Sequence, residues 1–259
     1  MTSMWRAALL LGISALLVAR AAPLRIATGE LPPYATAERS DQGLALAIVR
    51  RAFELGGHAV EFHFMPWSRA QLETQGGQWD ASAHWGATPE RRENFLLSDN
   101  LLTEDWVFVY RRSLKDFSWR TAADLRPYRI GLVRDYTYTP EIWALARSGQ
   151  IKSGSPPNDL AGLKMLLLDR IQVFPTERRV ACDLASRHLN PEQQAELIAH
   201  PKRMTDNFTT HVLFPKGKPA SDSLRLDFNR GLAQLRASPE YRQLLQVPIG
   251  CPAGLMAKP

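Results

Sequence analysis

The chain has 259 residues, of which 45% are hydrophobic and 22% are charged, and its formal net charge at pH 7 is +6. This composition is typical of an ordinary globular protein and excludes a disordered or fibrous chain. The basic residues include separate pairs at 50–51, 91–92, 111–112 and 178–179, whereas nucleic-acid-binding segments carry runs of roughly five to eight. We therefore expect no nucleic-acid partner, and the mild positive charge favours anionic solutes.

The first 21 residues have the pattern of a secretory signal peptide. Arg6 supplies the positive start, residues 7–18 supply a short apolar stretch, and Ala19-Arg20-Ala21 is an A-x-A cleavage site. The apolar stretch is shorter than the about 20 residues of a membrane-spanning helix. Because no cysteine lies near the cleavage site, we expect an unlipidated chain that begins at Ala22 and moves freely in the periplasm.

Strands and helices are predicted to alternate along the rest of the chain. Period-two alternation or continuous apolar runs indicate strands, and apolar residues at helical spacing indicate helices. In the first half the predicted elements are strands over 24–28, 60–64 and 106–110 and helices over 43–55 and 68–74. In the second half they are strands over 129–133, 171–174 and 211–214 and helices from Thr139, over 162–168 and 181–189, from Pro191, and over 221–235. Such alternation indicates an α/β fold with mostly parallel sheets.

The segment Thr88-Pro89-Glu90-Arg91 follows an apolar, strand-like run and opens a short helix. The planar guanidinium of an arginine binds a carboxylate through two parallel hydrogen bonds. From residue type alone, Arg91 is expected on the surface, because most arginines are exposed. The interpretation of Arg91 as an anion site therefore depends on the segments around it.

Five segments, in the same order, resemble the periplasmic solute-binding proteins of polar amino-acid importers, family 3. They are LRIATGELPPYA, GLALAIVRRAFELGG, SAHWGATPERRENFLLSD, YRIGLVRDYTYTPEIW and SLRLDFNRGLAQLRASPEYRQLL. The resemblance implies the α/β type II fold, with two lobes joined by two hinge crossovers and a ligand cleft between them. The implied bounds are residues 24–105 and 208–259 for lobe 1 and residues 106–207 for lobe 2.

Site residues follow from the resemblance position by position. Arg91 matches the arginine that binds the ligand's α-carboxylate, and Thr137 matches the hydroxyl that helps to hold it. Glu177 falls where the family has its amine-binding aspartate, although an exposed acid at a helix start is an equal alternative. Gly86 and His84 stand where the family has serines. Asp135 replaces a flexible glycine, so the carboxylate-facing wall loses hydroxyls and gains a negative charge.

Four aromatic residues are candidates for the walls of the ligand site. Aromatic faces stack on planar groups or hold cations, although buried aromatics are more often core residues. We expect Trp85, which precedes the arginine turn, to contact the ligand. The remaining candidates are Tyr34, Trp67 and Tyr136. His84 is interpreted equally as a core residue or as a ligand contact.

The resemblance implies a monomer that binds a small polar solute, amino-acid-like or otherwise carboxylate-bearing, and delivers it to an ABC-type importer. No phosphate-binding loop, nucleophile elbow or zinc motif occurs in the mature sequence, so we expect no catalysis, cofactor or metal. One alternative is a lyase or dehydratase on the same fold, with Glu177 as general acid and Arg91 orienting the substrate. Another is a module that reports its ligand to a sensor or assists a periplasmic redox enzyme.

The chain contains two cysteines, Cys182 and Cys251. An oxidising compartment permits a disulfide between them, and we favour this pairing. Two buried free thiols remain the alternative, because a sequence does not test the required geometry.

Export predicts a defined N-terminus. Cleavage after Ala21 should leave Ala22 as the first residue of the mature protein, because the apolar stretch ends at an A-x-A site. Mass spectrometry of protein recovered from the periplasm of a Gram-negative host measures this directly. An intact N-terminal segment in the periplasmic or membrane fraction would contradict it.

Overall fold

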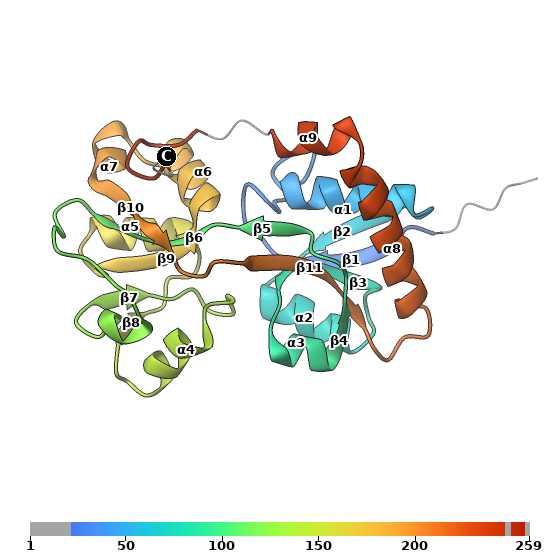
Figure 1. The fold of residues 1–259 in the computed structure, drawn as a ribbon, viewed down its shortest axis with the longest axis horizontal. Helices are drawn as coiled ribbons and strands as arrows, with labels where there is room; N and C mark the ends of the chain where they lie inside the picture. Colours follow the sequence, from blue (N-terminus) through green and yellow to red (C-terminus); the bar gives the residue numbers. More distant parts are fainter. Residues whose placement is uncertain (1–21, 247–249, 257–259) are drawn as a thin grey trace, which may run out of the picture.

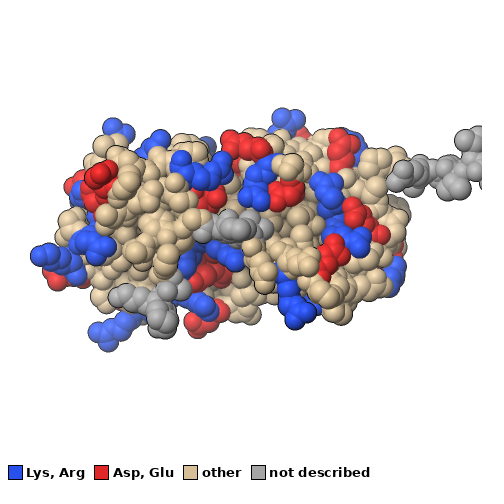
Figure 2. All heavy atoms as spheres, turned by 90° about the horizontal axis from the view of Figure 1, so that it is seen from above, with Lys and Arg blue, Asp and Glu red and all other residues tan. Residues whose placement is uncertain are grey.

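The structure, a computed structural model, describes residues 22–246 and 250–256. The predicted signal peptide lies outside the described residues. Two lobes lie side by side, each built on its own sheet (Figure 1). On the face shown in Figure 2, acidic and basic side chains are interspersed over both lobes rather than gathered by sign.

Lobe 1 is built on a mixed sheet of six strands in the order β2-β1-β3-β11-β4, with β5 also paired to β11. Strand β1 is parallel to β2 and β3, whereas β11 is antiparallel to β3, β4 and β5. The strands are β1 (Leu24–Thr28), β2 (Val60–Phe64), β3 (Ala81–Gly86), β4 (Phe95–Leu97), β5 (Leu102–Glu104) and β11 (Phe208–Pro215). The helices of this lobe are α1 (Leu44–Leu55), α2 (Trp67–Gln75), α3 (Pro89–Asn94), α8 (Ser221–Arg236) and α9 (Pro239–Leu245).

The core of lobe 1 lies between its sheet and the crossing helices α1 and α8. Phe53 of α1 packs 4.8 Å from Phe228 of α8 and 6.2 Å from Phe214 of β11, measured between ring centroids. The helices approach closely at Gly231, where a Cβ atom would lie 1.9 Å from the Ala52 carbonyl oxygen. On β11, Leu213 belongs to a different buried cluster, with Ala70 of α2, so both faces of the sheet are covered.

Lobe 2 is built on a five-stranded mixed sheet in the order β10-β6-β9-β7-β8. Strand β6 is antiparallel to β9 and β10, and β7 is parallel to β8 and β9. The strands are β6 (Trp106–Arg111), β7 (Arg129–Gly131), β8 (Lys152–Gly154), β9 (Val173–Glu177) and β10 (Leu197–Arg203). The helices are η1 (Ala122–Leu125), α4 (Pro140–Arg147), α5 (Asp159–Leu167), α6 (Arg178–His188) and α7 (Pro191–Glu196).

Two adjacent crossovers join the lobes. The chain leaves lobe 1 between β5 and β6 and returns between β10 and β11, and the two segments pair where Phe208 lies opposite Glu104. Figure 1 shows them as a double strand between the lobes. Backbone pairing at this point makes the two crossovers a single hinge.

A third connection is made by the C-terminal segment, residues 250–256. Cys251 forms a disulfide with Cys182 of α6. The Ala199 amide donates to the Gly254 carbonyl at 2.8 Å, and Arg178 Nη1 donates to the Leu255 carbonyl at 2.8 Å. The sequence-based bounds assign this segment to lobe 1, but its contacts are with elements of lobe 2. In Figure 1, α9 lies on lobe 1 and the C-terminal end lies beside α6.

The predicted elements differ from the structure in two informative ways. Both sheets are mixed rather than mostly parallel, because β11, β6 and β10 run against their neighbours. The strand expected over 171–174 is Val173–Glu177, and the helix that follows starts at Arg178. Among the described residues, no helix combines the length and apolar character needed to span a membrane.

The disulfide predicts a stability difference. Replacing both Cys182 and Cys251 by serine should lower the free energy of unfolding by about 4 kcal/mol in the chain-entropy treatment of a loop of this size, whose ends are 69 residues apart. Urea unfolding of the wild type and the double variant measures the difference, and the wild type under reducing conditions should follow the variant. Equal midpoints would contradict the prediction.

Candidate functional site

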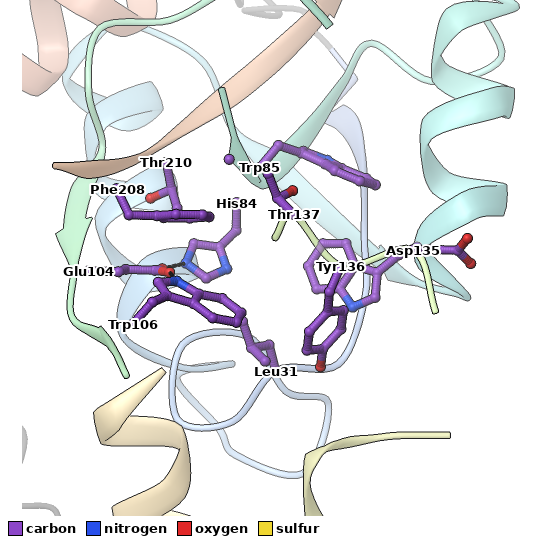
Figure 3. Close-up of a pocket in the computed structure, with 12 residues that line it drawn as sticks. Leu31, His84, Trp85, Glu104, Trp106, Asp135, Tyr136, Thr137, Phe208 and Thr210 are labelled. Atoms are coloured by element: carbon purple, nitrogen blue, oxygen red, sulfur yellow. Dashed lines mark hydrogen bonds and ion pairs between the residues drawn. The ribbon is translucent and has the colours of Figure 1, made fainter. Parts of the chain in front are cut away.

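A cavity of about 40 Å³ lies between the lobes, beside the hinge. Aromatic side chains form most of its wall, and both lobes contribute (Figure 3). It is lined by Leu31, Trp67, His84, Trp85, Gly86, Glu104, Trp106, Asp135, Tyr136, Thr137, Phe208 and Thr210. A second groove shares Trp67, Asp135 and Tyr136 with this interlobe cavity, so the two are adjacent.

Arg91 is placed beside the interlobe cavity by the start of α3. The Thr88 side chain caps this helix by accepting a hydrogen bond from the Arg91 amide at 3.1 Å, and Pro89 occupies the first turn. The Arg91 side chain is buried, and burial lowers its pKa to about 10. It therefore remains charged at pH 7.

The Arg91 guanidinium contacts both lobes. Nη1 donates to the Gly86 carbonyl at 2.9 Å and to Thr137 Oγ1 at 2.6 Å, across the interlobe boundary. Nε donates to Gln71 Oε1 at 2.9 Å, and the guanidinium carbon lies 4.6 Å from the ring centroid of Trp85. Arg91 and Thr137, expected as partners at the carboxylate, thus lie together.

Gly86 explains why this wall lacks a serine hydroxyl. A Cβ atom at this position would lie 2.7 Å from Phe208 Cζ and 3.0 Å from Thr137 Cγ2. A serine would therefore collide with side chains of the hinge strand and of lobe 2. The absence of a side chain lets Phe208 and Thr137 approach the end of β3.

A buried chain of three side chains lies at the hinge side of the cavity. Trp106 Nε1 donates to Glu104 Oε2 at 2.8 Å, and His84 Nε2 lies 2.7 Å from Glu104 Oε1. The His84 ring also stacks on Tyr34, with centroids 5.2 Å apart. His84 has a φ of 71°, a left-handed conformation in which histidine is enriched among non-glycine residues. His84 is thus both buried and part of the cavity lining.

Glu177 lies behind the cavity wall and caps α6. Its side chain is 1% exposed, accepts hydrogen bonds from the Val180 amide at 3.0 Å and the Asp105 amide at 3.3 Å, and interacts with Tyr34. Burial, followed by the nearby Glu104, raises the pKa of Glu177 to about 8. The burial excludes the alternative of an exposed acid at a helix start.

The structure brings together most of the residues singled out from the sequence. Trp67, Trp85, Gly86, Tyr136 and Thr137 line the interlobe cavity, and Arg91 contacts three of them, Trp85, Gly86 and Thr137. Arg91, Tyr34 and Glu177 themselves do not appear on the lining.

Sequence reasoning missed part of the wall. The residues that it did not select are Leu31, Glu104, Trp106, Phe208 and Thr210. All but Leu31 lie on or directly beside the hinge crossovers. The one sequence signal that could have indicated part of this set is the acid-aromatic pair Glu104 and Trp106, which flanks Asp105 at the start of an apolar strand. Among the described residues, no cluster of metal-ligating side chains is present.

Residues 24–247 match the bacterial extracellular solute-binding proteins, family 3, and the chain belongs to this family. Solved structures of the same two-lobed fold include an arginine-specific periplasmic binding protein from Salmonella typhimurium, with 18% identity, a TM-score of 0.68, and coverage of 88% of this chain and 98% of that chain. The expected family and the type II two-lobed fold are thereby confirmed. No curated protein sequence matches the chain.

Two further solved structures resemble the chain at the level of the fold. A histidine kinase sensor domain similar to periplasmic binding proteins has 16% identity and a TM-score of 0.73, with coverage of 89% of this chain and 98% of that chain. An ancestral amino acid-binding protein, described as a precursor of cyclohexadienyl dehydratase, has 18% identity and a TM-score of 0.68, with coverage of 86% and 93%.

The raised pKa of Glu177 predicts a pH-dependent stability. The folded state keeps the proton until about pH 8, whereas the unfolded carboxyl titrates near its ordinary value of 4.5. The stabilisation is therefore complete below pH 4.5 and is lost as the pH rises to 8, with a slope of up to about 1.4 kcal/mol per pH unit.

Urea unfolding between pH 4.5 and pH 8 tests this dependence. Glu177→Gln keeps an oxygen for the Val180 amide and removes the titration, so its stability should fall less with pH than that of the wild type. Glu192→Gln, at an exposed acid in the first turn of α7, is the matched control. Parallel curves for the wild type and Glu177→Gln would contradict the assignment.

Proposed function

We propose that the protein binds a small carboxylate-bearing solute in the interlobe cavity and delivers it to an ABC-type importer. The observation that carries this proposal is the environment of Arg91. This buried guanidinium has only neutral hydrogen-bond partners, and no carboxylate forms an ion pair with it within the described part of the chain. A buried cation with neutral partners favours an anion as its ligand.

The position of Arg91 also couples binding to lobe closure. Because Arg91 belongs to lobe 1 and Thr137 to lobe 2, a carboxylate held by both groups contacts both lobes. Such a ligand binds the closed arrangement more tightly than an open one, and so shifts the population towards closure.

The compartment follows from three independent features. Members of the family are extracellular, the sequence predicts a signal peptide, and the disulfide between Cys182 and Cys251 suits an oxidising environment. These features support a periplasmic protein. A permease with its ATPase is the partner that we propose for this compartment.

A catalytic function is the second candidate, and one observation favours it. Glu177 has a pKa raised to about 8, so it carries a proton at neutral pH, as a general acid requires. Its place behind the cavity lining argues for a structural role as the cap of α6. Conversion of a bound ligand by the wild type, lost in Glu177→Gln with binding retained, would establish the catalytic alternative.

Arg91 is the residue whose replacement tests the binding proposal. Ligands are first found by a thermal-shift screen over amino acids, polyamines, carboxylates and betaines. Arg91→Ala should then weaken binding of the ligand by roughly 2–5 kcal/mol, because an anionic group loses its buried partner. Arg91→Lys should recover only part of this loss, since an ammonium lacks the planar fork. Isothermal titration calorimetry measures both effects.

Arg92→Ala is the matched control, because the neighbouring Arg92 is exposed. This variant should bind as the wild type does. Equal affinities for the wild type and Arg91→Ala, with folding intact, would overturn the proposal.

A further inference from the structure

His84 has one ring nitrogen in use and one without a partner. Nε2 lies 2.7 Å from Glu104 Oε1, whereas Nδ1 is buried and has no hydrogen-bond partner among the described residues. The residue is 5% exposed and lines the interlobe cavity. In Figure 3 the edge that carries Nδ1 faces away from Glu104 and towards the middle of the cavity. A buried nitrogen in this position requires a partner.

The hydrogen bonds of Glu104 with Trp106 and with His84 determine whether His84 Nδ1 donates or accepts a hydrogen bond. An indole N–H only donates, and a carboxylate only accepts. Because both oxygens of Glu104 accept hydrogen bonds, from Trp106 Nε1 and from His84 Nε2, the His84 proton lies on Nε2. In the neutral ring, Nδ1 then presents a lone pair to the cavity and accepts from an N–H or O–H donor.

The aromatic wall indicates the shape of the group that carries this donor. Trp106 and Phe208 lie with ring centroids 5.1 Å apart, and Trp67 and Trp85 lie 5.0 Å apart. Together with Tyr136 they line the interlobe cavity. These pairs pack against each other, and the aromatic surface that they present to the cavity suits offset or edge-to-face contact with a flat ring.

The carboxylates of the wall do not suit the ammonium of a standard amino acid. Asp135 lines the cavity but is exposed, and in Figure 3 its carboxylate points away from the other labelled side chains. Glu177 is held behind the lining by its hydrogen bonds to the Val180 and Asp105 amides. Both oxygens of Glu104 are already engaged with Trp106 and His84. The cavity thus offers the lone pair of His84 Nδ1 for a single donor, and the Arg91 guanidinium, which donates to the lining residues Gly86 and Thr137, lies beside it for a carboxylate.

We propose that His84, positioned by Glu104 and Trp106, is a specificity-determining residue, and that the ligand is a single-ring aromatic or heteroaromatic carboxylic acid with an O–H or N–H donor on the ring. This inference rests on the proposed function and names its substrate class. Arg91 and Thr137 hold the carboxylate, the aromatic walls hold the ring, and His84 Nδ1 accepts from the ring donor.

Isothermal titration calorimetry with matched small acids separates the contribution of the ring donor from the contributions of the carboxylate and the ring. The 3- and 4-hydroxybenzoates carry a donor, benzoate carries none, and nicotinate carries an acceptor only. In the wild type, one hydroxybenzoate should bind on the order of 10–100-fold more tightly than benzoate, the usual effect of satisfying a buried polar group. Nicotinate should bind no better than benzoate.

Two variants test the role of the hydrogen-bonded side chains Trp106, Glu104 and His84. His84→Phe keeps a ring but removes Nδ1, so hydroxybenzoate should fall to the affinity of benzoate while benzoate binding persists. Glu104→Gln keeps an acceptor for Trp106, and its amide now donates to His84 Nε2. The His84 proton then moves to Nδ1, and the preference should reverse, with nicotinate binding more tightly than benzoate. A merely structural role for Glu104 does not predict this reversal.

The outcomes distinguish the inference from the proposed function. If none of the probes binds, or if benzoate and both hydroxybenzoates bind equally, the inference is overturned. An Arg91-dependent ligand of other chemistry, such as L-arginine, would overturn the inference and leave the proposed function standing. Binding of hydroxybenzoate that is unchanged in Arg91→Ala would instead overturn the carboxylate clamp. Thermal melts of each variant confirm that it is folded.

Discussion

The arrangement of the two lobes depends on the burial of one guanidinium between them. Arg91 is charged, largely removed from solvent, and held by the Gly86 carbonyl, Gln71 and Thr137. An isolated buried charge is strongly unfavourable, so these neutral groups must be placed accurately around it. That requirement accounts for the capped start of α3, for the absence of a side chain at residue 86, and for the approach of Thr137 from the opposite lobe.

A second constraint is the proximity of two buried acids at the hinge. Glu104 is paired with His84 and Trp106. Glu177 accepts hydrogen bonds from two backbone amides, lies beside Tyr34, and has a raised pKa. Two like charges so close together are unfavourable, and the proton on Glu177 removes the repulsion. Glu177 connects the hinge to the start of α6 through the Asp105 and Val180 amides, and Tyr34 stacks on His84 beside it.

The C-terminal segment adds a covalent constraint on the motion of the lobes. The hinge strands alone leave lobe 2 free to rotate about a single paired segment. The segment after α9 returns to lobe 2, where the disulfide from Cys251 to Cys182 and the buried Leu255 hold it. Residues 250–256 are therefore tied to lobe 2 by a covalent bond and by hydrogen bonds to Arg178 and Ala199, while α9 lies on lobe 1.

Much of the fold was predictable because it depends on local patterns. Helix α8 and strand β1 follow from the spacing of their apolar residues, and the start of α3 follows from Thr88 and Pro89. The strands that sequence reasoning missed include β4, β5 and β8, each only three residues long. A three-residue strand carries too little periodicity to be recognised, and it is defined by its pairing partner in the sheet.

The sequence by itself determined the family, the two-lobed architecture and the Arg91 motif, because each can be recognised from short segments and their order along the chain. Only the tertiary structure decided that Glu104 and His84 pair, that Glu177 is buried behind Tyr34, and that Phe208 fills the space above Gly86. These contacts join residues that are from 20 to more than 100 positions apart. The physical reason is that burial and hydrogen-bond partners are properties of the packed chain, so the same side chain is a surface charge, a helix cap or a ligand contact according to what surrounds it.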